Sequence, residues 1–288
     1  MKRKSLLLIL VVLLGLALVV TGCSKKEEPK NEQPQQEPNQ AEQSTGDGSW
    51  ERVQKAGKIV VGLDDGYPPM GYRDENGKLI GFDIDMGNEI GKRIGIEMEW
   101  MPAEWNSIVP SILAKRFDVI ISGMNMWEER KKQVNFAGPY GVSGQVILVE
   151  NDNNDEIKTL EDLKGKVVGT QLGSTGEKEL RAVGFTEKDM KLYDKFPQAF
   201  TDLDNGRVYA IVIDGFSSPE WIKTGKYKRV GDIIGADDKE AVIGIAVRKE
   251  DKELLDKLNE ALDSMKEDGT LTELSMKWIG YDITEGLE

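Results

Sequence analysis

Short runs rich in β-branched residues alternate with amphipathic stretches from about residue 50 to the end of the chain. Lys58–Leu63 has the composition of a strand, and Met86, Ile90 and Ile94 then mark one face of a helix. Asp83 stands at the expected position of that helix's capping residue. Strands that alternate with helices in this way indicate an α/β fold with mostly parallel strands.

The same pairing of strand and helix recurs further along the chain. Residues 166–170 and 208–214 have the pattern of strands, and helices are expected to follow Ser174 and Ser217. Near the end, an apolar stripe at helical spacing predicts a long helix with one buried face, formed by Leu254, Leu258, Leu262 and Met265.

Composition excludes several classes of function. Acidic residues outnumber basic ones by 51 to 38, giving a formal net charge of −13. No nucleic-acid partner is expected, because phosphate binding needs clustered Lys and Arg. The chain has no histidine, which removes histidine-dependent nucleophile systems and most zinc sites. We expect no metal, no cofactor and no catalytic residue.

The first residues of the chain have the pattern of an export signal. Basic residues at positions 2–4 precede an apolar run at positions 6–20, which is short for a membrane span. The run ends in VTGC, which resembles a bacterial lipobox, and Cys23 is the only cysteine of the chain. We predict a lipoprotein signal peptide at 1–22 and lipidation of Cys23; an ordinary signal peptide or an N-terminal anchor helix is the alternative.

The segment after Cys23 consists mostly of Lys, Glu, Gln, Pro, Asn and Gly. It has too little apolar surface to offset the entropy lost on folding. We therefore predict that residues 23–49 are the lipidated cysteine followed by a disordered tether.

Six ordered blocks stand out in the rest of the chain: VGLDDGYPPMGYRDENGKLIGFDIDM, FDVIISGMNMWEERKKQVNFAGPY, LEDLKGKVVGTQLGSTGE, NGRVYAIVIDG, GIAVRKEDKELLDKLNEAL and MKEDGTLTELSMKWIG. Together they resemble the amino-acid solute-binding proteins of polar amino-acid ABC importers, from about residue 59 to residue 281. The resemblance implies the type II periplasmic-binding-protein fold, which has two α/β lobes joined by paired crossover strands and a ligand in the cleft between them. It places the first lobe at 50–142 and 244–288, and the second at 143–243.

The resemblance also implies a function. The exported protein would bind a free amino acid and deliver it to an ABC permease with its ATPase. It would act as a monomer, held through lipid on Cys23 at the outer face of the cytoplasmic membrane, or on its periplasmic side where an outer membrane exists. Two alternatives stay open: an exported cyclohexadienyl or arogenate dehydratase-like enzyme with an acidic group in the cleft, and a stand-alone amino-acid sensor.

A free amino acid presents a carboxylate and an ammonium group. The resemblance assigns the carboxylate to Arg130, whose planar guanidinium can donate two parallel hydrogen bonds, and the ammonium to Asp214. It adds Ser174 and Thr175, which open a helix whose unpaired N–H groups attract an anion. Local sequence alone favours plainer roles: Arg130 is then a solvated surface residue, whereas Asp214 and Ser174 are helix caps.

The turn after the strand at 118–122 is also assigned to the site by the resemblance. Ser122, Gly123 and Asn125 match the turn that contacts the backbone of the ligand, although Asn125 replaces the more common Ser or Thr. Met124 of the same turn is expected to face the pocket for the ligand's side chain.

That pocket is expected to contain Asp64, Tyr67 and Trp105. Two rings and a carboxylate suit a cationic or strongly polar side chain. Asp65 and Glu104 add acidic groups beside the rings, and no lysine or arginine stands next to them in the sequence. The pattern favours a basic L-amino acid, with glutamine and cystine as alternatives; if the two rings face inward instead, they are ordinary core aromatics.

Overall fold

The computed structural model describes residues 46–235 and 239–287. The predicted signal peptide, Cys23 and the predicted tether up to residue 45 lie outside this part of the chain. Within the described ranges, no helix combines the length and the apolar character that crossing a bilayer requires.

Strands of the described residues form two five-stranded sheets and a small three-stranded one. The order of the first sheet is β5 (Glu97–Pro102), β1 (Lys58–Leu63), β6 (Val119–Ile120), β13 (Val242–Arg248) and β7 (Val134–Val142). In this sheet β1 pairs in parallel with β5 and β6, whereas β13 is antiparallel to β6 and β7. The predicted strand Lys58–Leu63 is confirmed.

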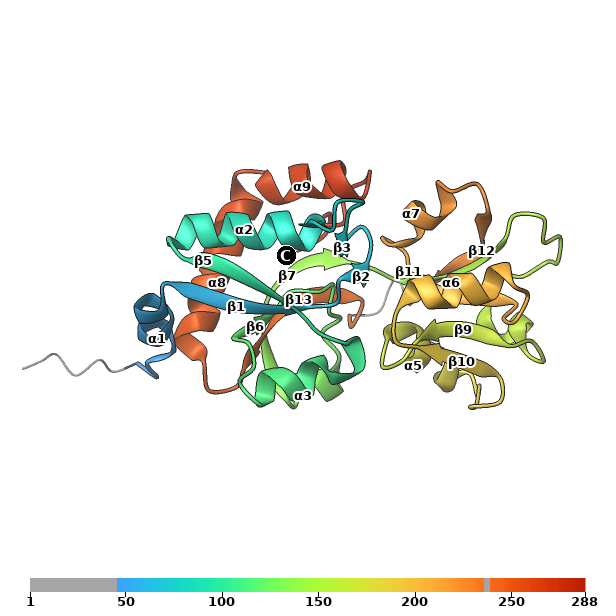
Figure 1. The fold of residues 1–288 in the computed structure, drawn as a ribbon, viewed down its shortest axis with the longest axis horizontal. Coiled ribbons are helices and arrows are strands. Elements are labelled where there is room, and N and C mark those ends of the chain that lie inside the picture. Colours follow the sequence, from blue (N-terminus) through green and yellow to red (C-terminus); the bar gives the residue numbers. More distant parts are fainter. Residues whose placement is uncertain (1–45, 236–238, 288) are drawn as a thin grey trace, which may run out of the picture. The chain divides into compact units, whose positions relative to one another are not determined.

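Helices pack around the first sheet and complete the first lobe, with α2 and α9 on one side and α3 on the other (Figure 1). They are α1 (Ser49–Ala56), α2 (Phe82–Ile94), the 3₁₀ turn Trp105–Ser107, α3 (Ile108–Leu113), α4 (Glu128–Lys131), α8 (Lys252–Glu267) and α9 (Thr270–Trp278). The small sheet β2 (Gly66–Tyr67), β3 (Gly71–Arg73) and β4 (Leu79–Ile80) lies between β1 and α2 in the sequence.

The second sheet repeats the plan of the first. Its order is β10 (Met190–Tyr193), β9 (Val168–Gln171), β11 (Ala210–Asp214), β8 (Gln145–Glu150) and β12 (Tyr227–Ile234). Its helices are the 3₁₀ turn Leu160–Leu163, α5 (Thr175–Ala182), α6 (Phe196–Asp204) and α7 (Ser218–Ile222). Here β9 is parallel to β10 and β11, and β8 is antiparallel to β11 and β12. The predicted fold class, two α/β lobes, is confirmed.

Two connections run between the lobes. One follows β7 through Ser143 and Gly144 into β8, and the other returns from β12 to β13. The two segments are bonded to each other, because the Ser143 N–H donates to the carbonyl of Ala241 at 2.8 Å. The lobe boundaries at 142/143 and 243/244 stay a prediction.

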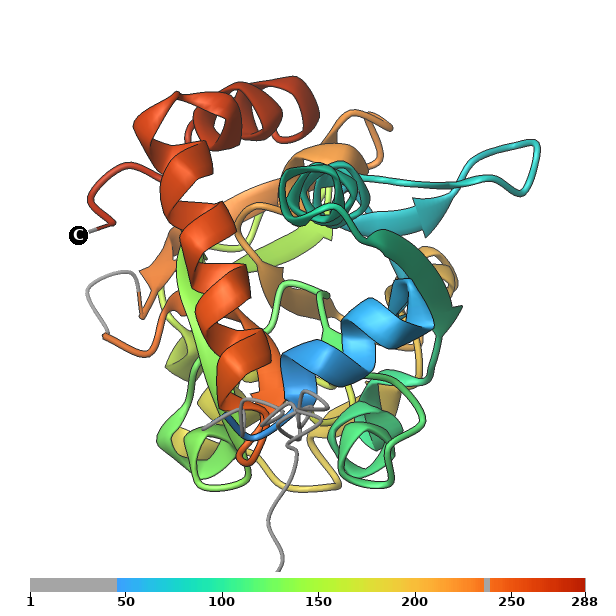
Figure 2. The ribbon, with the colours of Figure 1, turned by 90° about the vertical axis from the view of Figure 1, so that its left-hand side faces the viewer.

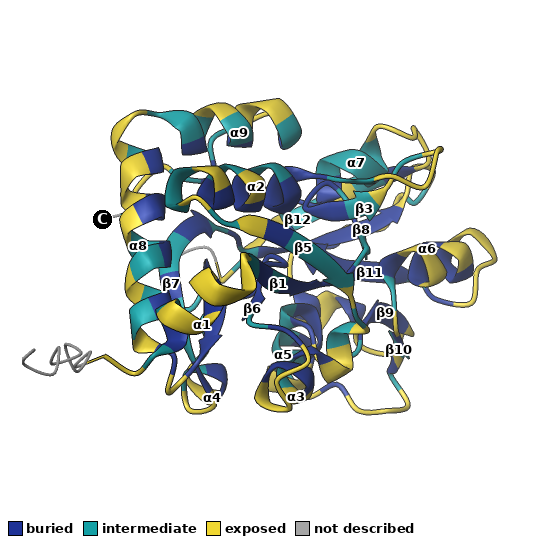
Figure 3. Cartoon of the chain, turned by 60° about the vertical axis from the view of Figure 1, so that its left-hand side comes forward, coloured by how far each residue is buried: buried dark blue, intermediate teal, exposed yellow. Residues whose placement is uncertain are grey.

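The cores of both lobes are built from strands and from the inward faces of the helices (Figure 3). The four members of the predicted apolar stripe lie on α8 and have 0% exposed area. Burying such a side chain stabilises a fold by about 1.5–3 kcal/mol. The expectation that Asp83 caps α2 is wrong: Gly81 holds the capping position, and Asp83 lies inside the helix with 0% exposed area.

The N-terminus of α8 is capped by a distant segment of the chain. The carboxylate of Asp47 accepts from the N–H groups of Lys252 and Glu253 at 2.6 and 3.0 Å, and the hydroxyl of Ser49 accepts from that of Leu254 at 3.0 Å. Figure 2 shows α1 lying against this end of α8. Because Asp47 and Ser49 supply the acceptors that the first turn of α8 needs, the folded part begins earlier than its polar composition suggests.

Candidate functional site

Residues from both lobes line one pocket. The first lobe contributes Tyr67, Trp105, Gly123 and Asn125, and the second contributes Gln171, Ser174, Thr175 and Asp214. Most of them stand at or just beyond the carboxyl ends of β1, β5, β6, β9 and β11, the edge at which α/β sheets usually present functional groups. All of these residues except Gln171 were predicted from the sequence.

Asp214 is the last residue of β11 and lies in this pocket with 6% exposed area. Its carboxylate accepts hydrogen bonds from the Gln145 amide at 2.6 Å and from the hydroxyl of Tyr67, which belongs to the first lobe. Burial raises the pKa of Asp214, although these bonds and the nearby Arg130 oppose the shift. The negative charge is therefore poorly solvated and favours a positively charged partner.

Arg130 is the buried positive charge of the site, with 7% exposed area. Its guanidinium donates to the carbonyls of Asn125 at 3.0 Å and Gly173 at 3.1 Å. It also lies over the rings of Trp127 and Trp105, 3.7 and 5.1 Å from their centroids. Burial lowers the pKa of Arg130 to about 10, and the charge of Asp214 opposes this shift. The simple surface interpretation of Arg130 is wrong.

The start of α5 meets the first lobe. The Ser174 hydroxyl accepts from the Glu177 N–H at 3.2 Å, so the interpretation of Ser174 as a helix cap is confirmed, and the residue also lines the pocket. The Thr175 hydroxyl donates to the side-chain oxygen of Asn125 at 2.6 Å. Asn125, which stands where Ser or Thr is more common, therefore links the two lobes through its side chain.

Ser122 and Asp64 lie immediately behind the pocket lining. The Ser122 hydroxyl accepts from the backbone N–H of Asp64 at 3.0 Å and thereby ties the end of β1 to the turn after β6. The Asp64 carboxylate, in a residue with 1% exposed area, accepts from the N–H of Gly66 at 2.9 Å and from the Gln171 amide at 2.6 Å. Burial raises the pKa of Asp64, and these hydrogen bonds oppose the shift.

Gln171 is the pocket residue that the sequence prediction missed. Its side-chain amide nitrogen donates to Asp64 and, at 2.8 Å, to the backbone carbonyl of Asp194. With both amide hydrogens engaged, the side-chain oxygen is the group that Gln171 can offer to a ligand, as an acceptor. Its position at the end of β9, just before Ser174, is a signal that could have identified it.

The acidic groups around the two rings are not as free of basic neighbours as the sequence suggests. Asp65 accepts from Lys195 of the second lobe at 2.6 Å and from Arg73 at 2.8 Å. Burial alone would raise the pKa of Asp65, but these two ion pairs outweigh it and lower the pKa. Asp65 is thus neutralised by the chain itself, whereas Asp64, behind the pocket lining, forms no ion pair with any of the described residues.

Tyr67, Trp105 and Met124 differ in how they are placed. Tyr67 has 5% exposed area and packs against Phe196 and Phe216, with ring centroids 5.9 and 6.0 Å away, so it is both a core aromatic and a pocket wall. Trp105 donates from its indole to the Gly173 carbonyl at 3.1 Å. Met124 packs in the apolar cluster under α3 and lines a neighbouring pocket with Trp105 and Arg130, so its predicted contact with the ligand stays a prediction.

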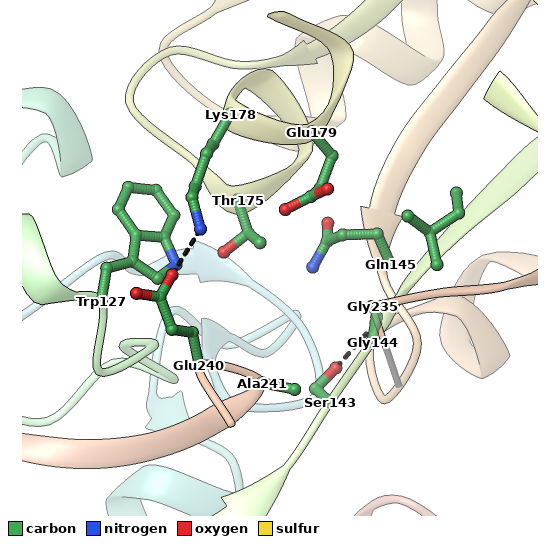
Figure 4. Close-up of a pocket in the computed structure, with 11 residues that line it drawn as sticks. Trp127, Ser143, Gly144, Gln145, Thr175, Lys178, Glu179, Gly235, Glu240 and Ala241 are labelled. Atoms are coloured by element: carbon green, nitrogen blue, oxygen red, sulfur yellow. Dashed lines mark hydrogen bonds and ion pairs between the residues drawn. The ribbon is translucent and has the colours of Figure 1, made fainter. Parts of the chain in front are cut away.

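A second pocket lies beside the first, at the crossover segments (Figure 4). Thr175 lines both. Here Lys178 of α5 pairs with Glu240 at 2.5 Å, and the Glu240 carboxylate accepts from the N–H of Glu128 in α4 at 3.2 Å. This ion pair connects the second lobe with the crossover and with the helix that carries Arg130.

Two named proteins of Escherichia coli strain K12 are similar to this chain. The L-cystine-binding protein TcyJ is 36% identical over 239 residues, which are 83% of this chain and 89% of that protein. The ABC transporter arginine-binding protein 1 is 36% identical over 225 residues, which are 77% of this chain and 91% of that protein. Both are binding proteins by name.

Solved structures of two ancestral proteins are also similar. An arginine-binding protein, solved with arginine and with glutamine, has a TM-score of 0.72 and 44% identity in both cases; the similarity covers 78% of this chain and 99% and 98% of the two solved chains. An amino acid-binding protein described as a precursor of cyclohexadienyl dehydratase has a TM-score of 0.73 and 37% identity, covering 80% of this chain and 98% of its own.

The model of one protein family matches most of the chain. It covers residues 59–281, which include all of both sheets except Lys58 and every residue of the pocket. With this extent of match and the relatives described above, the chain belongs to family 3 of the bacterial extracellular solute-binding proteins.

Proposed function

We propose that this protein captures a free L-amino acid outside the cytoplasm and delivers it to the permease of an ABC importer. The observation that carries the proposal is a pair of buried opposite charges: Asp214 lines the pocket between the lobes, and Arg130 contacts two of its lining residues, Asn125 and Trp105. An α-amino acid presents the complementary pair, a carboxylate and an ammonium. Buried charges are stable when they are paired, so the site favours a zwitterion over a neutral or singly charged ligand.

We further propose that the ligand has a basic side chain. The Gln171 oxygen supplies an acceptor in the pocket lining, the Asp64 carboxylate lies directly behind it, and Trp105 supplies a ring for cation–π contact. The names of the relatives include arginine-binding and cystine-binding proteins, and one ancestral relative was solved with both arginine and glutamine. Arginine is thus the lead ligand, with cystine and glutamine as the alternatives to be tested beside it.

The function is tested by calorimetry and thermal-shift measurements with arginine, lysine, ornithine, histidine, glutamine and cystine. Ligand that binds only the native state raises the melting temperature. At least one amino acid should bind with a Kd in the micromolar range or below, and no binding by any of the twenty common amino acids, ornithine or cystine would contradict the proposal.

The variant Asp64→Asn tests the class of the ligand. It removes the charge and nearly keeps the shape, so a cationic ligand should lose about 10-fold or more in affinity, since hydrogen bonds to charged groups contribute about 1.5–3 kcal/mol. A neutral ligand such as glutamine should change far less. The matched control is Asp74→Asn, at the exposed turn between β3 and β4. Equal losses for arginine and glutamine would contradict the basic-ligand proposal.

An exported dehydratase is the second candidate, because one structural relative is described as a precursor of cyclohexadienyl dehydratase. That relative is itself called an amino acid-binding protein. Prephenate and arogenate incubated with the purified protein should remain unchanged. Turnover that is lost in Asp64→Asn would instead favour the enzyme.

We also propose that Cys23 is the lipid anchor of the protein. The support is in the sequence: the apolar run ends at the only cysteine, ahead of a polar segment. Cys23→Ala should be processed or secreted without a lipid, so cell fractionation should find it in the soluble fraction while the parent protein sediments with membranes. Processed Cys23→Ala protein that remains with the membranes would rule out the lipid anchor.

A further inference from the structure

A buried carboxyl group lies beneath the pocket, at a place that the proposed function does not use. Asp83 of α2 and Tyr140 of β7 both have 0% exposed area, and the Tyr140 hydroxyl donates to one Asp83 oxygen at 3.0 Å. The other oxygen of that carboxyl, Oδ2, finds no hydrogen-bond partner within the described part of the chain. A buried polar atom without a partner costs stability, so its retention calls for a physical reason.

The Tyr140 hydroxyl connects this carboxyl group to the pocket. Its oxygen accepts from the backbone N–H of Gly123 at 3.0 Å. An ionised carboxylate can only accept, so Asp83 forces the Tyr140 hydrogen toward itself and leaves a lone pair of the phenol facing Gly123. The hydrogen-bond chain therefore has one direction, from the Gly123 N–H through Tyr140 to Asp83.

Gly123 is a position where small movements reach the ligand. It lines the pocket, its φ is +53°, and a Cβ placed there would approach the Tyr67 ring to 2.9 Å. Tyr67 in turn donates to Asp214. The hydrogen bond from the Gly123 N–H to Tyr140 thus holds the turn in a left-handed conformation, against the Tyr67 ring that forms the pocket wall.

We propose that Tyr140 and Asp83 are positioning residues, which fix the ligand-binding turn through the Gly123 N–H, and that protonation of Asp83 weakens ligand binding. This inference rests on the proposed function for its ligand, but its structural part does not. Protonation gives Asp83 a hydrogen of its own, which removes the requirement that Tyr140 donate to it. The ionised carboxylate also polarises the Tyr140 O–H and strengthens its oxygen as an acceptor for the Gly123 N–H, so protonation weakens the hold on the turn.

The surroundings of Asp83 contain no compensating charge among the described residues. Burial raises the pKa of Asp83 to about 7, and the hydrogen bond from Tyr140 and the nearby backbone N–H of Gly123 oppose the shift. Tyr67 and Tyr140 are the other titratable groups that feel its charge. Burial holds both of their pKa values well above the usual range, followed by the charge of Asp214 for Tyr67 and by that of Asp83 for Tyr140. They stay neutral around pH 7, so Asp83 is the member of the chain that titrates there.

The other charged residues of α2 form ion pairs among themselves and with neighbouring elements. Asp85 pairs with Lys277 of α9, and Arg93 pairs with Glu89 of its own helix and with Asp268 after α8. None of these ion pairs includes Asp83. Charge changes in the outer pairs are therefore expected to leave the titration of Asp83 nearly unchanged.

The sign of the linkage follows from the raised pKa. The native state binds the Asp83 proton more tightly than the unfolded chain, so this group's contribution to stability is complete at pH values below about 4 and is lost as the pH rises through about 7. Asp83→Asn keeps an acceptor for Tyr140 without the charge. It should remove this loss of stability between pH 5.5 and pH 8.5.

The experiment compares the parent protein with Tyr140→Phe and Asp83→Asn, and uses Tyr72→Phe, on β3 outside the pocket lining, as the matched control. Three quantities are measured at pH 5.5 and 8.5: hydrogen exchange at the Gly123 amide, the midpoint of urea unfolding, and the Kd for L-arginine. Tyr140→Phe should speed Gly123 exchange about 3- to 10-fold, the loss expected for one hydrogen bond, whereas Tyr72→Phe should not.

In the parent protein the Kd for L-arginine should be about 3- to 10-fold weaker at pH 5.5 than at pH 8.5 because of Asp83, and Asp83→Asn should abolish that part of the difference. Unchanged Gly123 exchange in Tyr140→Phe would overturn the positioning role. If the Kd of the parent protein and that of Asp83→Asn depend on pH in the same way, the proposal that protonation of Asp83 weakens binding is overturned. If the parent protein does not bind arginine at all, the proposed ligand is wrong, and the exchange and unfolding measurements still decide this inference.

Discussion

Replacing Asp214 with asparagine is expected to weaken binding of the amino-acid ligand by about 30-fold to several thousand-fold, or about 2 to 5 kcal/mol. The substitution leaves the ligand's ammonium in a closed, buried site without a charged partner. The carboxylate cannot be replaced by neighbours, because its remaining contacts are the neutral groups of Tyr67 and Gln145.

The fold should tolerate this substitution. Burial raises the pKa of Asp214, which means that the native state already disfavours its charge, so Asp214→Asn should unfold at the same urea concentration or a higher one. Asp204→Asn is the matched control in the same lobe, since Asp204 pairs with Lys226 outside the ligand pocket. Calorimetry that shows near-parental affinity for Asp214→Asn would contradict the assignment of the ammonium site.

Replacing Arg130 with methionine should cause a loss of similar size, about 2 to 5 kcal/mol of binding free energy. The variant keeps most of the side-chain stem between Trp105 and Trp127 but removes the group that can hold a carboxylate. Arg130→Lys should recover little, because a lysine keeps the charge without the planar fork and its stacking.

An analogue without the carboxylate makes this test specific. If arginine is the ligand, the parent protein should bind it far more tightly than agmatine, and in Arg130→Met that preference should nearly vanish. Arg116→Met, at an exposed position of the first lobe, should preserve the preference. A strong preference for arginine in Arg130→Met would show that another group binds the carboxylate.

Local sequence patterns predicted the features of the fold that depend on local physics. The strand at 58–63 and the apolar stripe of α8 follow from side-chain periodicity, and both are present. The two-lobed architecture came from the resemblance of ordered blocks, and the family match confirms it. The individual roles of the predicted site residues stay predictions, although the pocket brings most of them together.

Sequence patterns could not predict the features that depend on contacts between residues far apart in the chain. Asp83 has the position of a helix cap, and only its proximity to Tyr140, which is 57 residues away, makes it a buried acceptor. Asp65 lies in an acidic run, yet Lys195 from the other lobe neutralises it. Helical and strand periodicity reports which face of an element is buried, but it does not report which residue of another element lies opposite.

The cap that Asp47 places on α8 has a practical consequence for any sensor built from this protein. The described chain enters the first lobe through Asp47 and leaves from the same lobe, where the Ile283 carbonyl accepts from the N–H of Val142 at 2.8 Å. Fluorescent reporters fused to the two ends would therefore both be attached to the first lobe, and the distance between them would change little in a hinge movement. An informative pair needs one dye on an exposed position of the second lobe, such as a cysteine introduced at Lys188, and the other on the first.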